Sequence, residues 1–221
     1  MKNNREKEFR KIGFSKEDIS VFKKLNSPAK IQDFLDNEVS YNLEEKLETF
    51  YSPKLVLRYK RAHCFEGSVF AAAALAFNGF KPLLLDLRAV KDDDHVVAVF
   101  RQNGLWGAIG QSKFIGLRYR EPIFPSIKCL SLSYFENYFD WNAKKDLREY
   151  SSPFNLEKFG KKWMVSDDEK KGIEFLADAL DKSRHFDLIP KKTSKFLRKV
   201  TKFNYKAEIL VMPKKLKKLK K

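Results

Sequence analysis

An alanine-rich apolar segment that opens with a cysteine constrains this chain more than any other feature. The segment runs from Cys64 to Phe77 and stops at Asn78-Gly79. Asn-Gly readily adopts the left-handed backbone conformation at which helices commonly end, so we expect a helix here. Gly67 and the four alanines Ala71 to Ala74 let neighbouring strands approach closely. A central helix packed against a sheet requires such close approach.

Short apolar runs after this segment predict the strands of that sheet. They cover Pro82 to Leu87, Val96 to Phe100 and Leu105 to Ile109. His95 leads the second run. Residues 114–120 alternate well enough to form a fourth strand, followed by an extended connection over residues 123–125.

Further helices are expected wherever a capping residue or an apolar stripe indicates one. Ser15 can cap a helix from Lys16 onward, and Ser27 precedes a proline suited to the first helical position. Other helical segments are expected over residues 126–139, 167–180 and 191–212. Residues 141–152 are interpreted as a polar, turn-rich crossing, and His185 as a turn residue.

The chain length of 221 residues fits one domain with a small helical appendage. The expected parts are an N-terminal helical extension (1–26), a core (27–160), a C-terminal helical region packed on the core (161–212) and a disordered basic tail (213–221). The fold class is therefore α+β, with a central cysteine-bearing helix on a small antiparallel sheet and extra helices at both ends.

The positions of Cys64 and His95 are typical of a thiol acyl-transfer site. A helix N-terminus lowers the pKa of a thiol because its unpaired N–H groups and dipole favour the anion. A neutral histidine within hydrogen-bonding reach takes the thiol proton and later returns it to the leaving amine. His63 is the weaker candidate base, because a residue next in sequence to the nucleophile points in another direction.

Each residue also has a purely structural interpretation. A lone cysteine on an alanine-rich helix is commonly a small core residue, and Cys129 is most simply a packed core thiol. A histidine after three aspartates, Asp92 to Asp94, is commonly a solvated turn residue. Their joint occurrence in a helix–strand–strand frame favours a shared site.

Several motifs resemble the transglutaminase-like superfamily, which belongs to the papain-like cysteine-protease architecture. They are residues 61–67 (Arg-Ala-His-Cys-Phe-Glu-Gly), 92–96 (Asp-Asp-Asp-His-Val), 106–109 (Trp-Gly-Ala-Ile), 118–122 and 147–151. More narrowly, they are similar to a poorly characterised bacterial transglutaminase-like family. The resemblance covers roughly residues 27–160. It implies a papain-like core with Cys64 as nucleophile and His95 as base.

The superfamily also implies a third catalytic residue, an aspartate on the strand after the histidine. Residues 106–112 contain no carboxylate. Gln111 and Ser112 could orient an imidazole but could not offset its charge. In thiol proteases of this architecture the loop before the cysteine often supplies an oxyanion donor, and this loop contains Arg61. Arg61 could hold an acidic substrate or be a solvated surface charge.

Asp86 is the candidate for the missing acid. A hairpin symmetric about residues 90 and 91 would place Asp86 opposite His95, with Cβ atoms roughly 4.5–5.5 Å apart. A carboxylate there would fix the histidine tautomer and stabilise the imidazolium. The alternative is that Asp86 binds a backbone N–H or an arginine, such as Arg88 or Arg118.

The formal net charge of +16 raises the question of an anionic partner. The tail from Pro213 to Lys221 contains six lysines, which leaves +10 spread over both signs in the rest of the chain. A lysine-rich proteome can produce such a value without a nucleic-acid function. The tail itself could make nonspecific contacts with polyanions.

Other patterns limit the remaining classes. No apolar run approaches the length of a membrane span, and the N-terminus lacks the apolar segment of a signal peptide. Two cysteines fit a reducing cytoplasm. Three histidines and two cysteines show no paired metal-ligand spacing, and no glycine-rich phosphate loop occurs. We expect a cytoplasmic monomer without metal or cofactor.

The sequence thus favours a thiol-dependent amide or peptide acyl transfer, hydrolysis rather than cross-linking, on a protein, peptide or amide substrate. Water is always available as acceptor, whereas an amine acceptor needs a dedicated site. The alternatives are a catalytically inactive transglutaminase-like scaffold and a basic nucleic-acid-binding protein, although no nucleic-acid motif is recognisable.

Overall fold

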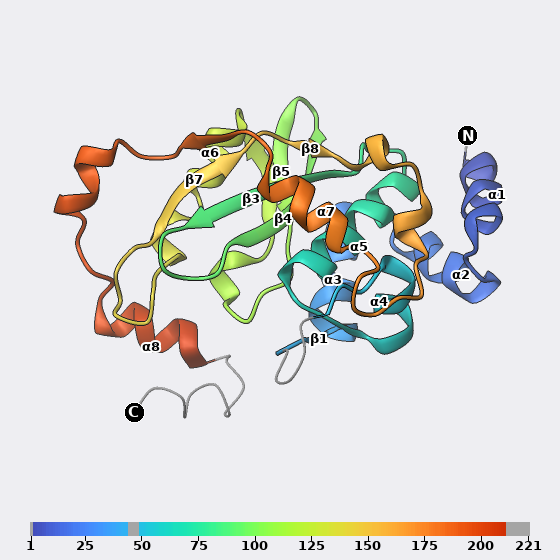
Figure 1. Ribbon diagram of the computed structural model, residues 1–221, viewed down its shortest axis with the longest axis horizontal. Coiled ribbons are helices and arrows are strands. Elements are labelled where there is room, and N and C mark those ends of the chain that lie inside the picture. Colours follow the sequence, from blue (N-terminus) through green and yellow to red (C-terminus); the bar gives the residue numbers. More distant parts are fainter. Residues whose placement is uncertain (1, 44–48, 211–221) are drawn as a thin grey trace.

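The computed structural model of the chain describes residues 2–43 and 49–210, and it has the expected mixed α+β class (Figure 1). An antiparallel sheet has the strand order β6-β5-β4-β3-β7-β9, and β8 also pairs with β3. Its strands are β3 (Leu83–Ala89), β4 (His95–Gln102), β5 (Leu105–Ile109), β6 (Arg120–Phe124), β7 (Leu147–Ser151), β8 (Phe154–Asn155) and β9 (His185–Asp187). A separate parallel pair joins β1 (Ser40–Tyr41) to β2 (Arg61–Ala62).

Helices surround the sheet, and α5 is the longest of those described. The α-helices are α1 (Lys2–Ile12), α2 (Lys16–Lys24), α3 (Pro28–Glu38), α4 (Pro53–Tyr59), α5 (Cys64–Phe77), α6 (Ile127–Leu132), α7 (Glu174–Asp181) and α8 (Lys202–Leu210). Short 3-10 helices cover Ile115–Leu117, Phe135–Asn137, Leu156–Phe159, Lys162–Met164 and Lys191–Phe196. No helix in the described part of the chain has the length and apolarity needed to cross a bilayer.

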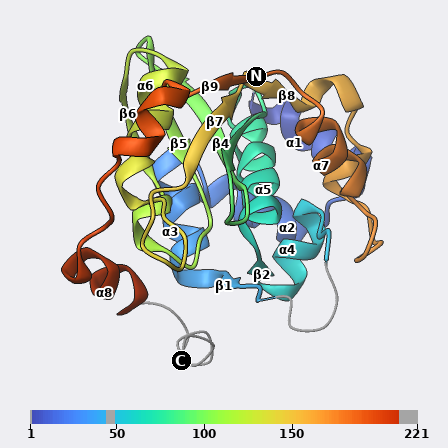
Figure 2. The ribbon, with the colours of Figure 1, turned by 60° about the vertical axis from the view of Figure 1, so that its left-hand side comes forward.

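Helix α5 packs along one face of the sheet, beside β4 (Figure 2). Ala71 to Ala74 are fully buried. A Cβ atom on Gly67 would lie 2.5 Å from the Cβ of Gln111, closer than two such atoms can approach. The small residues therefore do bring the helix against the chain that follows β5, as expected from the sequence.

Strand alternation divides the buried residues into two clusters. Leu84, Val96 and Ala98 face the α5 side of the sheet, whereas Leu85 and Val97 face the other side. Successive side chains of a strand point to opposite faces, so both faces of β3 and β4 are covered.

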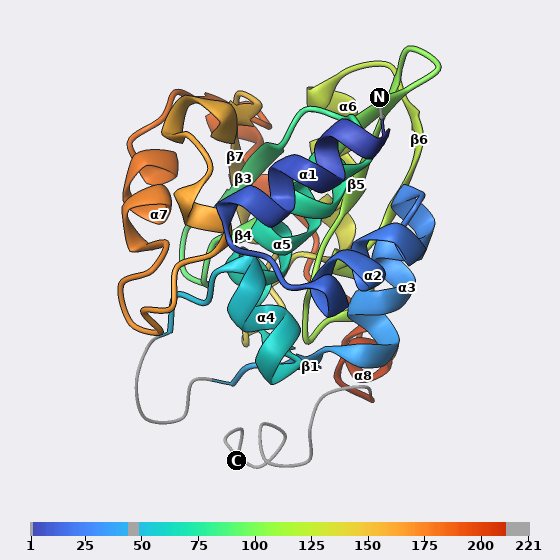
Figure 3. The same cartoon turned by 90° about the vertical axis from the view of Figure 1, so that its right-hand side faces the viewer.

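The N-terminal segment contributes to the main core and is not peripheral. Helix α1 crosses in front of α5 in Figure 3, and the ring of Phe9 packs edge-on against Phe77 with centroids 5.1 Å apart. Phe22 is fully buried and stacks on Phe70 at 5.9 Å. The predicted helix from Lys16 is confirmed, and α1 was not predicted.

The region after residue 140 differs most from the sequence-based expectation. Residues 147–151, expected to be a crossing, form β7 inside the sheet, and residues 185–187 add β9 beside it. The region 161–212 is therefore not simply helical. Helix α7 begins at Glu174 rather than Asp167, because the carboxylate of Asp168 accepts the N–H groups of Lys170 and Lys171 in a turn.

Two further predictions on the far side of the sheet were wrong. The fourth strand, β6, covers residues 120–124 instead of 114–120, and it tolerates Pro122 because it lies at the sheet edge. The helix expected over 126–139 is limited to Ile127–Leu132, and Cys129 on it is exposed rather than packed. The predicted tail (213–221) lies outside the described residues.

Phe22→Ala should lower the free energy of unfolding by about 3–5 kcal/mol, because it leaves a cavity among packed rings. Phe203→Ala is the matched control: Phe203 is 82% exposed, and its loss should change stability by less than about 0.5 kcal/mol. Urea denaturation measures both. Equal small effects would mean that the first 25 residues do not stabilise the core.

Candidate functional site

Cys64 is the first residue of α5, and His63 is its N-cap. The Nδ1 atom of His63 accepts the N–H of Phe65 at 3.3 Å, and the Glu66 carboxylate accepts the N–H of His63 at 2.9 Å. These reciprocal bonds form a capping box, in which a histidine replaces the usual serine or threonine. The thiol therefore lies at the positive end of the helix.

The ring of His63 is occupied by this structural role. Its Nε2 atom lies 3.0 Å from the carbonyl oxygen of Thr49, to which it can donate, while Nδ1 accepts from Phe65. With both nitrogens engaged, the neutral His63 ring is poorly placed to act as general base for Cys64.

His95 opens β4, and its side chain is buried. Its Nε2 atom lies 2.7 Å from the carbonyl oxygen of Leu117. A carbonyl only accepts, so Nε2 carries the proton in this bond and Nδ1 is the basic nitrogen of the neutral ring. The edge contacts with Tyr134 and Tyr138, at centroid distances of 6.3 and 6.5 Å, complete its apolar surroundings.

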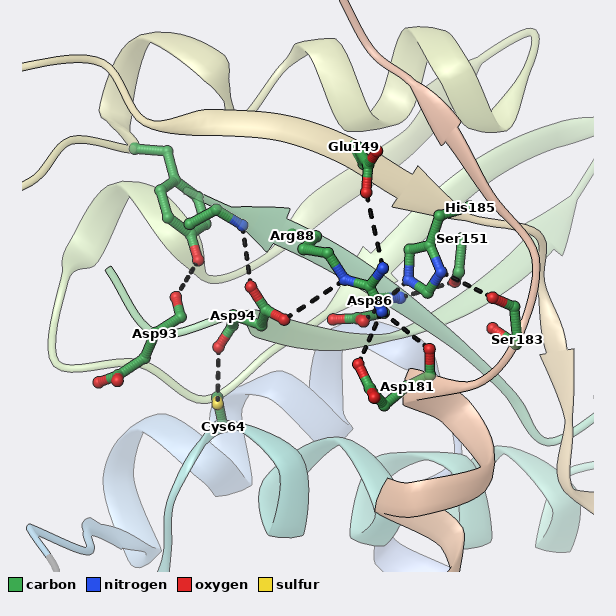
Figure 4. Close-up of polar contacts among 12 residues, drawn as sticks. Cys64, Asp86, Arg88, Asp93, Asp94, Glu149, Ser151, Asp181, Ser183 and His185 are labelled. Carbon is green, nitrogen blue, oxygen red and sulfur yellow. Dashed lines mark hydrogen bonds and ion pairs between the residues drawn. The ribbon is translucent and has the colours of Figure 1, made fainter. Parts of the chain in front are cut away.

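The environment of Cys64 favours the thiolate. Burial raises the pKa of the thiol, but the interactions with the nearby rings of His63 and His95 outweigh burial and lower the pKa to about 5. The sulfur lies 3.9 Å from the carbonyl oxygen of Asp94, the residue before His95 (Figure 4). The structure thus places the two predicted residues, Cys64 and His95, in the wall of one cavity, where the His95 ring lowers the pKa of the thiol.

A cavity of about 620 Å³ opens beside these residues. His63, Cys64 and His95 lie in its wall. The rest of the wall comes from residues 41–43, 92–94, 112–114 and the helix α7, together with Phe50, Phe65, Asp86, Val96, Leu117 and Tyr138. The hydroxyl of Tyr138 donates to the carbonyl oxygen of Asp93 and so ties the loop before β4 to the far side of the sheet. The thiol is therefore accessible from a space large enough for a side chain or short peptide.

The predicted pairing of Asp86 with His95 is wrong by one residue. In the register of β3 and β4, Leu87 lies opposite His95 and Asp86 lies opposite Val96. A slip of one residue moves a side chain to the other face of the sheet. The cause is the connection: Asp94 accepts the N–H of Ala89 at 2.9 Å, which extends β3 beyond the predicted end.

Asp86 instead bonds to His185, which was predicted to be a turn residue but opens strand β9. Its Oδ2 lies 3.0 Å from Nε2 of His185, whose Nδ1 lies 2.8 Å from the carbonyl oxygen of Ser183. If Nδ1 donates to Ser183, the bond to Asp86 needs one further proton, held by the ring or by the carboxyl group. Burial raises the pKa of Asp86 to about 6, although His185 lowers it. The three-residue strand β9 gives no periodic signal that could have predicted this pair.

The other predicted residues have structural partners. The side-chain amide of Gln111 donates to the carbonyl oxygens of Leu35 and Val39 at 3.2 and 2.9 Å, which ties it to α3. Ser112 lines the cavity, and its hydroxyl accepts the N–H of Phe114. Arg61 donates to the hydroxyl of Tyr51 and does not line the cavity. None of the three bonds to His95 in the described structure.

Within residues 2–43 and 49–210, no cluster of three or more metal-ligating side chains is arranged to hold an ion. The chain matches no protein-family model, and a search of curated proteins finds no significantly similar sequence. The interpretation of the site therefore depends on its geometry and chemistry.

Iodoacetamide should label Cys64 at a nearly constant rate between pH 6 and 8, and the rate should fall as the pH decreases through about 5. His95→Ala should slow labelling at pH 6, because it removes a group that lowers the pKa of the thiol. Cys129, which is more exposed, is the internal control. Peptide mass spectrometry separates the two sites. Faster labelling of Cys129 at pH 6 would contradict an activated Cys64.

The Asp86 pair should make stability depend on pH. A folded pKa of about 6, above the ordinary value of 3.8, means that the folded state holds this proton more tightly. The resulting stabilisation is present below about pH 4 and is lost as the pH rises through 6. Asn cannot ionise, so the free energy of unfolding of Asp86→Asn should not fall over this pH range. Relative to the unmodified chain, it should rise by roughly 2–3 kcal/mol between pH 4 and 7. Urea denaturation at each pH measures it, with the exposed Asp33→Asn as control. Parallel curves for Asp86→Asn and the unmodified chain would refute the assignment.

Proposed function

We propose that this chain is a thiol-dependent amide hydrolase of the transglutaminase-like, papain-like type. The single observation that carries the proposal is that Cys64, at the N-terminus of α5, and His95, at the start of β4, line one cavity and interact there, with a thiol pKa of about 5. A cysteine-bearing helix packed on an antiparallel sheet supports the same assignment.

In the first step, the thiolate of Cys64 attacks the substrate carbonyl, and an oxyanion develops on its oxygen. The backbone N–H of Cys64 has no hydrogen-bond acceptor in the described part of the chain, so it can donate to this oxyanion. The thiol proton, held on Nδ1 of His95, passes to the leaving amine as the C–N bond breaks. This leaves a thioester on Cys64 and a free amine.

In the second step, water attacks the thioester. Nδ1 of His95 takes a proton from the water, the C–S bond breaks, and the thiolate and a carboxylic acid are regenerated. We favour water over an amine as the acceptor because water needs no binding site.

A catalytically inactive scaffold is the second candidate, and one observation favours it. No carboxylate bonds to the His95 ring in the described structure, and the Leu117 carbonyl takes that place. A carbonyl fixes the tautomer, but it carries no full charge to stabilise an imidazolium.

A substrate-independent test is the release of p-nitrophenol from p-nitrophenyl acetate. The proposal predicts a burst of one equivalent and an acetyl group on Cys64, found by mass spectrometry. Cys64→Ala should abolish the burst, and His95→Ala should slow thioester hydrolysis by about 10²–10⁴-fold, the usual contribution of a general base.

Cys129→Ala is the matched control and should retain the full burst. Acetylation of Cys129 or lysines at the same rate as Cys64, or a burst that persists in Cys64→Ala, would favour the scaffold.

A further inference from the structure

The wall of the cavity beside Cys64 is strongly acidic, although the chain as a whole is basic. Seven carboxylates line it: Asp86, Asp92, Asp93, Asp94, Glu174, Asp178 and Asp181. Lys113 is the single lysine or arginine among the described lining residues. The carboxylates form two groups, one on the loop before β4 and one on α7, on either side of Asp86.

Internal cations neutralise only part of this charge. Arg88 bonds to Asp181 at 2.7 Å and lies 3.7 Å from Asp94. Asp93, Glu174 and Asp178 make no ion pair with any described residue. The excess negative charge affects Tyr138. Burial raises the pKa of its hydroxyl, and the nearby charges of Cys64 and the carboxylates raise it further.

Asp86 provides an independent indication of a ligand. The residue is only 3% exposed, and its Oδ1 atom has no hydrogen-bond donor among the described residues, while Oδ2 bonds to His185. A buried carboxylate oxygen without a donor is costly, and in native proteins it usually has a partner. The oxygen is buried, but Asp86 belongs to the cavity wall, so a small shift of this side chain would let a bound group donate to it.

We propose that this wall binds a positively charged side chain of the substrate, a lysine or an arginine, close to the amide held at Cys64. This inference deepens the proposed function and rests on it for the position of the amide. The wall begins next to the nucleophile, since the backbone of Asp94 lies 3.9 Å from the sulfur. The carboxylates are spread along two elements and form no metal-binding cluster in the described residues, which suits an extended cationic group better than an ion.

The same charge indicates what the bound amine does. Carboxylates stabilise the protonated ammonium group, and a protonated amine has no lone pair with which to attack a thioester. The wall therefore recognises the substrate and does not supply an acyl acceptor, in agreement with hydrolysis.

The test is binding of peptide amides to the full chain carrying Cys64→Ala, which needs no turnover. A lysine peptide is compared with its norleucine counterpart, and an arginine peptide with its citrulline counterpart. Each charged peptide should bind about fivefold or more tightly than its neutral partner, the size of a partly exposed ion pair. Raising the salt concentration should reduce this preference.

Asp93→Asn with Asp178→Asn should reduce the preference severalfold. Neither side chain makes an ion pair with a described residue, so folding should be retained. Asp33→Asn with Asp187→Asn is the matched control, since both residues are exposed and neither lines the cavity. Equal loss in both double variants would show a general charge effect and overturn the inference.

Two more measurements distinguish failure of this inference from failure of the proposed hydrolase function. If the unmodified chain cleaves charged and neutral peptides equally well, the inference fails and the hydrolase stands. If Cys64→Ala binds charged peptides preferentially but the unmodified chain cleaves none, the hydrolase fails and the charge recognition stands. Binding of 1,5-diaminopentane without binding of the lysine peptide would overturn the peptide assignment and indicate a free amine.

Discussion

The buried carboxylate of Glu66 holds the first turn of α5, and the geometry of the site depends on it. Glu66 is fully buried and accepts the hydroxyl of Thr49, the N–H of Tyr51 and the N–H of His63, at 2.7, 2.7 and 2.9 Å. One turn later, the hydroxyl of Ser68 donates to the carbonyl oxygen of Val96 at 2.7 Å. These bonds fix the start of the helix against the start of β4. These hydrogen bonds of Glu66 and Ser68 therefore position Cys64 relative to His95.

The features predicted correctly from the sequence are those encoded locally. The alanine-rich run and its Asn-Gly end belong to one helix, and α5 begins and ends as expected. Strands β3, β4 and β5 each contain a short apolar run, so their existence could be predicted without knowledge of their neighbours. The proximity of Cys64 to His95 results from how these elements pack, because a helix that crosses a sheet brings its N-terminus near the ends of the strands.

The features that were missed depend on distant residues. Strand β7 has three half-buried residues, Arg148, Glu149 and Tyr150, and it is a strand because β3 and β9 pair with both of its edges. The register of the β3–β4 hairpin is set partly by Asp146, which accepts the N–H groups of Lys91 and Asp92 at 2.7 and 2.8 Å. A carboxylate more than 50 positions away cannot be assigned to that loop from the sequence. The hydrogen-bond partner of His95, the carbonyl oxygen of Leu117, could not be predicted either, because every residue type has a backbone carbonyl.

The use of a carbonyl where a triad has a carboxylate is chemically consistent with a cysteine nucleophile. In a serine triad the histidine removes the hydroxyl proton during the attack, so a carboxylate must stabilise the imidazolium as it forms. In the proposed reaction, a thiol with a pKa of about 5 has lost its proton before substrate arrives, and the thiolate is itself an anion close to the ring. The remaining requirement is that the ring keeps Nδ1 toward the sulfur, and the 2.7 Å contact of Nε2 with Leu117 meets it. Under the proposed mechanism, the lack of an acid beside His95 in the described structure therefore impairs catalysis less than it would beside a serine.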